Sequence, residues 1–91
     1  MSMNANTKNK LTAALDLFRN IEDNALMNIS ESAVDAGMFD DYTHSYHHYS
    51  ALRIGLVSMT QLAIDHPSQV DQSQIDFLLE TADIWRDEEE D

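Results

Sequence analysis

Residues 64–74 read Ile-Asp-His-Pro-Ser-Gln-Val-Asp-Gln-Ser-Gln and include Pro67, the only proline of the chain. A proline inside a helix removes a hydrogen bond and clashes with the preceding turn, so a helix upstream of Pro67 must end near it. Just beyond, Ser68 to Asp71 and Asp71 to Gln74 each have capping-box form, with a side-chain acceptor three residues before an acid or an amide. The stretch therefore predicts that one helix ends here and another begins.

Outward from this junction, apolar residues recur at steps of three and four, the spacing of amphipathic helices. Gly37 and Gly55 are the only glycines, and no stretch shows the alternation or the turn pairs of a β-hairpin. The sequence predicts an all-α fold, a small three-helix bundle that homodimerisation would complete. The helices are expected at about 7–27, 40–66 and 70–87, with a short irregular or helical piece at 31–38.

The length of 91 residues predicts a single helical domain at 1–86, followed by an acidic tail at 87–91. Acidic side chains in the last turn of a helix oppose its dipole, so this tail is expected to fray. The hydrophobic content of 43% is too high for a disordered acidic chain.

Composition excludes several classes of function. The chain has no cysteine, which excludes disulfide scaffolds, thiol catalysis and zinc sites built on cysteine. Two glycines are too few for a phosphate-binding loop, and the net charge of −12 opposes direct binding to nucleic acid. No apolar run has the length of a membrane span or the pattern of a signal peptide. No cofactor and no membrane partner are expected, and the cytoplasm is the default location.

The helix expected at 70–87 carries apolar residues around roughly 200° of its circumference, more than a lone three-helix bundle usually buries. Phe77 and Ile84 form the extra flank, which predicts either contact with another chain or cover by the segment at 28–39 of the same chain. Acidic residues occupy the remaining strip of this helix. In the preceding helix, tyrosines recur at intervals of four and three residues. The predicted partner-binding residues are Asp76, Glu80, Asp83, Asp87, Phe77, Trp85, Tyr42, Tyr46 and Tyr49. For Trp85 the first expectation is a core anchor, and the alternative is an interface residue.

The helix expected at 40–66 also carries a column of small residues, Ala51, Gly55 and Ser58, that ends at Leu62. Small side chains let two helix backbones come close together. The column predicts a tight helix crossing, either within the chain or across a dimer to which Ile84 also contributes.

Histidines gather at the start of the same helix, where residues 44–48 read His-Ser-Tyr-His-His. His44 and His48 are four residues apart, the helical spacing with which two imidazoles bind one Zn²⁺ or Ni²⁺. His47, Asp40 and Asp41 would complete the site. The alternatives are a solvated or structural cluster and a pH sensor.

The charge is unevenly distributed, because residues 1–30 are neutral overall and residues 31–91 carry the whole net charge of −12. No nucleophile motif or buried carboxyl is evident, so an enzyme is not expected. The sequence predicts a regulatory or inhibitory protein-interaction module that binds a basic protein surface. In size and charge alone it resembles the small phage-borne inhibitors of restriction and CRISPR enzymes. The alternatives are therefore a nucleic-acid mimic that blocks a basic channel, and a histidine-based metal or pH sensor.

Overall fold

The computed structural model describes residues 3–90, and the side chains of residues 3–88. This part of the chain contains four α-helices, one short 3-10 helix and no strand, which confirms the all-α prediction. The prediction of three long helices is wrong in number. The elements are α1 (Ala5–Asn20), α2 (Asp23–Asp35), α3 (Tyr42–Asp65), η1 (Pro67–Gln69) and α4 (Gln72–Glu90).

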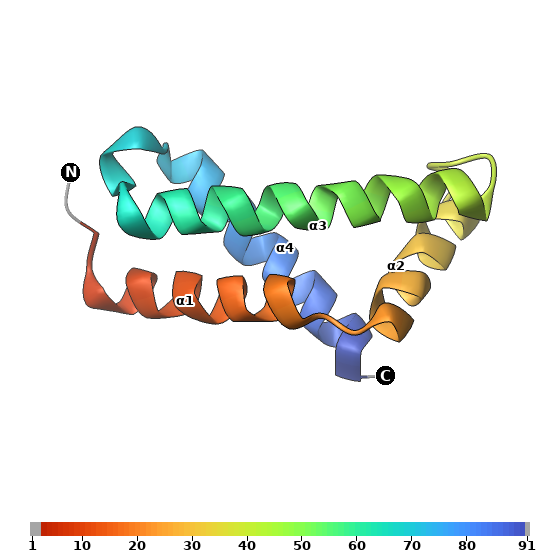
Figure 1. The fold of residues 1–91 in the computed structure, drawn as a ribbon, viewed down its shortest axis with the longest axis horizontal. Coiled ribbons are helices and arrows are strands. Elements are labelled where there is room, and N and C mark those ends of the chain that lie inside the picture. The colour runs from red at the N-terminus through yellow and green to blue at the C-terminus, as the bar shows by residue number, and fades with distance from the viewer. Residues whose placement is uncertain (1–2, 91) are drawn as a thin grey trace.

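Helices α1 and α3 run antiparallel side by side, α4 crosses behind them, and α2 closes the end where α1 stops and α3 starts (Figure 1). The body they form measures 42 × 23 × 18 Å. Each helix contributes one apolar side to a single core, as an amphipathic helix does when it packs. The core residues are Leu11, Ala14, Phe18, Leu26, Ile29, Leu56, Ala63, Val70, Ile75, Leu78, Ala82 and Trp85.

The first predicted helix, 7–27, is broken in the structure at Ile21 and Glu22. Both residues are extended, with ψ values of 135° and 149°. The apolar spacing stays in phase from Phe18 through Ile21 to Ala25, so periodicity alone does not reveal the break. The break turns the chain and allows α2 to bury Leu26 against the core at one end of the molecule. Most of the piece expected at 31–38 consequently belongs to the end of α2.

Helix α2 ends in a Schellman motif, in which a glycine in the left-handed conformation follows the last helical residues. Gly37 has φ +80°, its N–H donates to the Val34 carbonyl at 3.0 Å, and the Met38 N–H donates to the Ala33 carbonyl at 2.9 Å. Two carbonyls at the end of α2 are thereby satisfied. The turn directs Met38 back toward the helix that it has just left.

The junction around Pro67 is confirmed in outline. Helix α3 ends at Asp65, against the predicted 66, and the Asp71 N–H donates to the Gln74 side chain at 2.7 Å, as expected of a capping box at the start of α4. The other predicted capping box, from Ser68 to Asp71, does not start an α-helix, because Ser68 lies within the 3-10 helix η1. Helix α4 continues through Glu90, so the backbone of 87–90 is helical; fraying of this turn stays a prediction, and Asp91 lies outside the described residues.

We expect Gly37→Ala to lower the free energy of unfolding by about 1 kcal/mol, because a Cβ is strained at a positive φ. Urea denaturation followed by circular dichroism measures the change. Gly55→Ala, in the middle of α3 and with open space around it, is the matched control. In dilute solution it should raise the free energy of unfolding by roughly 0.5–1 kcal/mol. Equal effects of the two substitutions would contradict this account.

Candidate interaction site

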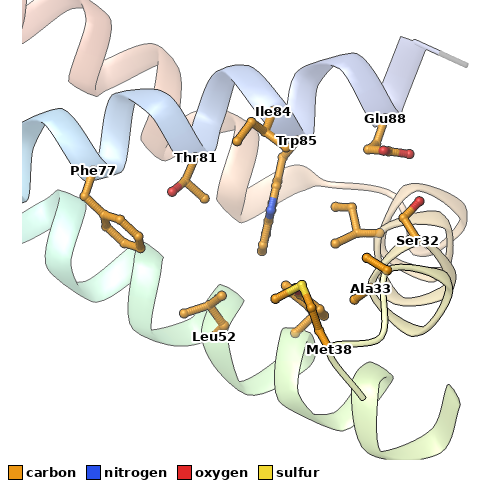
Figure 2. A pocket seen from close by; sticks show the side chains of 12 residues that line it. Ser32, Ala33, Met38, Leu52, Phe77, Thr81, Ile84, Trp85 and Glu88 are labelled. Carbon is orange, nitrogen blue, oxygen red and sulfur yellow. The ribbon is translucent and has the colours of Figure 1, made fainter. Parts of the chain in front are cut away.

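An apolar groove of about 320 Å³ lies between α2, α3 and α4, and we call it the α4 groove (Figure 2). Its α2 side includes the turn that follows Gly37, so the Schellman motif helps to shape it. Among the side chains that the structure describes, Glu88 is the only charged one that lines it. The lining residues are Ile29, Ser32, Ala33, Ala36, Met38, Tyr49, Leu52, Phe77, Thr81, Ile84, Trp85 and Glu88.

Three large apolar side chains at the α4 groove remain in contact with solvent. Met38 is 65% exposed, Phe77 48% and Ile84 61%. In the part of the chain that the structure describes, only three other large apolar residues are exposed. Half of the exposed large apolar side chains therefore lie at the α4 groove. Clusters of exposed apolar side chains with a polar border are typical of interaction sites. The predicted contact flank of Phe77 and Ile84 is thus unpartnered within the chain.

Trp85 is first of all a core residue. It is 3% exposed, and its ring packs edge-to-face against Phe18 at a centroid distance of 5.4 Å and near Tyr49 at 6.3 Å. The indole also lies along the α4 groove, where Figure 2 shows it between α4 and the Met38 turn. The residue therefore links the stability of the core to the shape of the groove.

The predicted acidic row is exposed along α4, beside the groove. Glu80 lies three residues after Phe77 and four before Ile84, so its carboxylate neighbours both on the helix surface. The row is not uniform, because Arg86 donates to the Asp83 carboxylate at 2.8 Å. Three of the four predicted acids, Asp76, Glu80 and Asp87, make no ion pair with a basic residue in the described structure.

The three tyrosines do not act as one stripe. Tyr49 lines the α4 groove, whereas Tyr42 and Tyr46 stack on each other at a centroid distance of 6.0 Å, away from the groove lining. Burial raises the pKa of the Tyr42 hydroxyl, and the charges of Glu31 and Tyr46 raise it further. Of the three tyrosines, only Tyr49 therefore lies in the groove where we propose that a partner binds.

The predicted metal site is not assembled. His44 pairs with Asp41 at 3.1 Å, within the N-terminal cap of α3, while His48 packs on Phe39 and Tyr49. His47 contacts the Tyr46 ring instead, and Asp40 lies in the preceding bend. Among the described residues, no three His, Asp or Glu side chains converge as a metal ion requires. The cluster divides because His44 is paired with Asp41 whereas His48 packs among aromatic rings, which residue spacing alone does not show.

The small-residue column does not make a helix crossing within the chain, which corrects one of its two predicted uses. Ala51, Gly55, Ser58 and Leu62 all lie on the exposed side of α3. A Cβ added at Gly55 would meet no atom within 4 Å. The close contact of α3 with α2 is made elsewhere, where the buried Ser45 hydroxyl donates to the Ser30 carbonyl at 2.8 Å.

Met38 and Leu52 are groove residues that the sequence analysis missed. A signal for Met38 was present, since a hydrophobic residue directly after a C-terminal glycine often packs back on its helix. Leu52 shares the broad apolar side of α3, and no local pattern separates its groove-facing members from its core-facing members.

Comparison with protein-family models, curated proteins and solved structures finds no match to this chain. Within the described residues, no helix combines the length and apolar character needed to cross a membrane.

Proposed function

We propose that the chain is a small, non-catalytic protein-interaction domain, regulatory or inhibitory in role, whose α4 groove binds a basic amphipathic segment of a partner protein. One observation carries the proposal: exposed apolar side chains gather in a groove beside a row of exposed carboxylates. The apolar lining supplies contact area, and the acidic border selects the charge of the partner.

The apolar part of the proposed contact is centred on Phe77, Ile84 and Met38. Aromatic residues and methionine are enriched at the centres of interfaces, where a few buried side chains carry most of the binding energy. Burying a fully exposed side chain of this size contributes about 1.5–3 kcal/mol, and these three are still about half to two-thirds exposed. Together they contribute about 3–5 kcal/mol, so contacts along the rest of the groove and at its acidic border must offset the remaining cost of association.

The charged part of the proposed contact consists of Asp76, Glu80 and Asp87. No lysine or arginine lines the groove, so nothing within it neutralises an approaching acidic partner or repels a basic one. Carboxylates at the border of an apolar site accelerate association with a basic partner and exclude acidic ones. A helix with one apolar side and flanking Lys or Arg residues satisfies both requirements.

A nucleic-acid mimic remains the second candidate, and the exposed acidic row on α4 favours it. The ion pair between Arg86 and Asp83 interrupts that row and reduces its likeness to a phosphate backbone. Mimicry of a phosphate backbone also does not explain why Phe77 and Ile84 are exposed, whereas binding of an amphipathic segment does.

The test is selection of a displayed random peptide library on the full chain. We expect the selected peptides to be basic and to carry apolar residues at steps of three and four. Their dissociation constants should rise about tenfold or more for Phe77→Ser with Ile84→Ser, and with added salt. The matched control is Ile54→Ser, since Ile54 is 63% exposed and lies on α3 away from the groove.

Selected peptides that are acidic, or that bind the groove variant as tightly as the native chain, would contradict the proposal. Basic peptides without apolar spacing, lost only when Asp76, Glu80 and Asp87 are changed to amides, would support the mimic instead.

A further inference from the structure

The outward side of α3 is a second exposed surface, separate from the α4 groove. Ile54 is 63% exposed and Leu62 37%, and we call the strip that contains them the α3 face. Between these two side chains the strip carries Gly55 and Ser58, whose small size leaves the helix backbone close to solvent. The strip also carries Ala51, and Ala51, Gly55 and Ser58 are all exposed in the part of the chain that the structure describes.

Charge distinguishes the α3 face from the acidic helices α2 and α4. Residues 42–64 contain no acid, although the chain carries 17 acids and a net charge of −12. Their only basic residue, Arg53, is directed to the other side of the helix, where it donates to the Arg19 carbonyl at 3.4 Å. Helices α2 and α4 carry most of the acids, so two copies that meet through them repel each other. Two copies that meet through the α3 face do not.

The two ends of the α3 face carry different groups. Exposed histidines, His44 and His47, lie at its start, where His44 also pairs with Asp41 of its own chain at 3.1 Å, and the exposed Asp65 lies at its end. When two identical helices pair antiparallel about a two-fold axis, the start of each lies against the end of the other. This pairing places His44 of one copy near Asp65 of the second copy, over a contact about 30 Å long at 1.5 Å per residue.

The centre of such a pairing is the step from Ile54 to Gly55, midway between His44 and Asp65. Glycine weakens a helix interior, and no contact in the described part of the chain requires it here, because a Cβ at Gly55 would meet nothing within 4 Å beyond the backbone of its own helix. In the antiparallel register Ile54 of one copy lies over Gly55 of the other, where the missing side chain leaves room for it. Ala51 and Ser58 then face each other across the axis.

From the exposed apolar side chains, the absence of acids and the opposed ends, we propose that the α3 face binds a second copy of this chain in an antiparallel dimer. The α4 grooves lie outside this contact, so the dimer presents two of them. The inference does not depend on the proposed function of the groove.

The first test is sedimentation equilibrium and light scattering on the full chain. The native chain is expected to reach twice its mass of 10.4 kDa as its concentration rises. Ile54→Glu should raise the dissociation constant of the dimer at least about tenfold. Ile84→Glu is the matched control, because Ile84 is equally exposed, at 61%, but lies at the groove. Thermal unfolding checks that both variants fold.

The second test fixes the orientation and uses the absence of cysteine from the chain. Mixed and oxidised, His44→Cys and Asp65→Cys proteins should form a mixed disulfide dimer in preference to dimers of either protein alone. Preferred linkage of each variant to itself would show a parallel pair and overturn the proposed geometry. A native chain that stays monomeric at its solubility limit, or an Ile54→Glu variant that dimerises normally, would overturn the dimer itself.

Discussion

Phe18→Ala is expected to remove about 3–5 kcal/mol from the free energy of unfolding, the cost of deleting a fully buried aromatic side chain. Phe18 is 0% exposed and contacts Trp85 edge-to-face, in the region where α1 passes α4. A domain of this size has a total stability of about 5–15 kcal/mol, so the substitution consumes a large share of it. Aromatic pairs of this geometry add about 0.5–1.5 kcal/mol beyond burial, which places the loss toward the upper end.

Urea denaturation measures this effect, with the fluorescence of Trp85, the only tryptophan, as one signal and circular dichroism as another. Phe77→Ala is the matched control, because Phe77 is the same residue type but 48% exposed. Its loss should stay below about 1.5 kcal/mol. Similar losses for the two variants would mean that the packing described for Phe18 is wrong.

The parts of the fold that local chemistry determines could be predicted from the sequence. Pro67 and the capping box at Asp71 mark the junction of α3 and α4 to within a few residues of the observed ends. The apolar width of α4 likewise indicates an extra flank at Phe77 and Ile84, although it leaves open whether the chain covers that flank; in the structure both residues are exposed at the groove. In each case the determining groups lie within one or two helical turns of each other.

The parts that depend on contacts between distant residues could not be predicted in this way. The extended residues Ile21 and Glu22 interrupt an apolar pattern that remains in phase, so only the packing of α2 favours a break there. The histidine cluster is similar, because the neighbours of His44 and His48, an acid and two aromatic rings, set their surroundings more than their spacing does. Spacing predicted a metal site, and the packing of α3 divides it.

The burial of Ser45 also depends on a contact between distant residues, and substitution of Ser45 is expected to have the second large effect on stability. In sequence it is one polar residue within a histidine-rich segment, yet the structure buries it completely, with its hydroxyl bonded to the Ser30 carbonyl of α2. We expect Ser45→Leu to lower the free energy of unfolding by about 2–3 kcal/mol, the upper part of the range for an overpacked core. The loss is large because the added atoms press against the backbone of α2, which must move as a whole.

Amide hydrogen exchange distinguishes this displacement from general loosening, since amides in 23–35 should exchange much faster while those of α1 and α4 change little. Ser45→Ala, which removes the hydrogen bond but adds no volume, should cost only about 1 kcal/mol. Thr43→Leu, an exposed site on the same helix, should change stability by less than about 0.5 kcal/mol. Because Ile29 and Ala33 of α2 line the α4 groove, peptides selected on the native chain should also lose affinity for Ser45→Leu and keep it for Thr43→Leu. Unchanged exchange in α2 would show that Ser45 does not determine how α2 packs on α3.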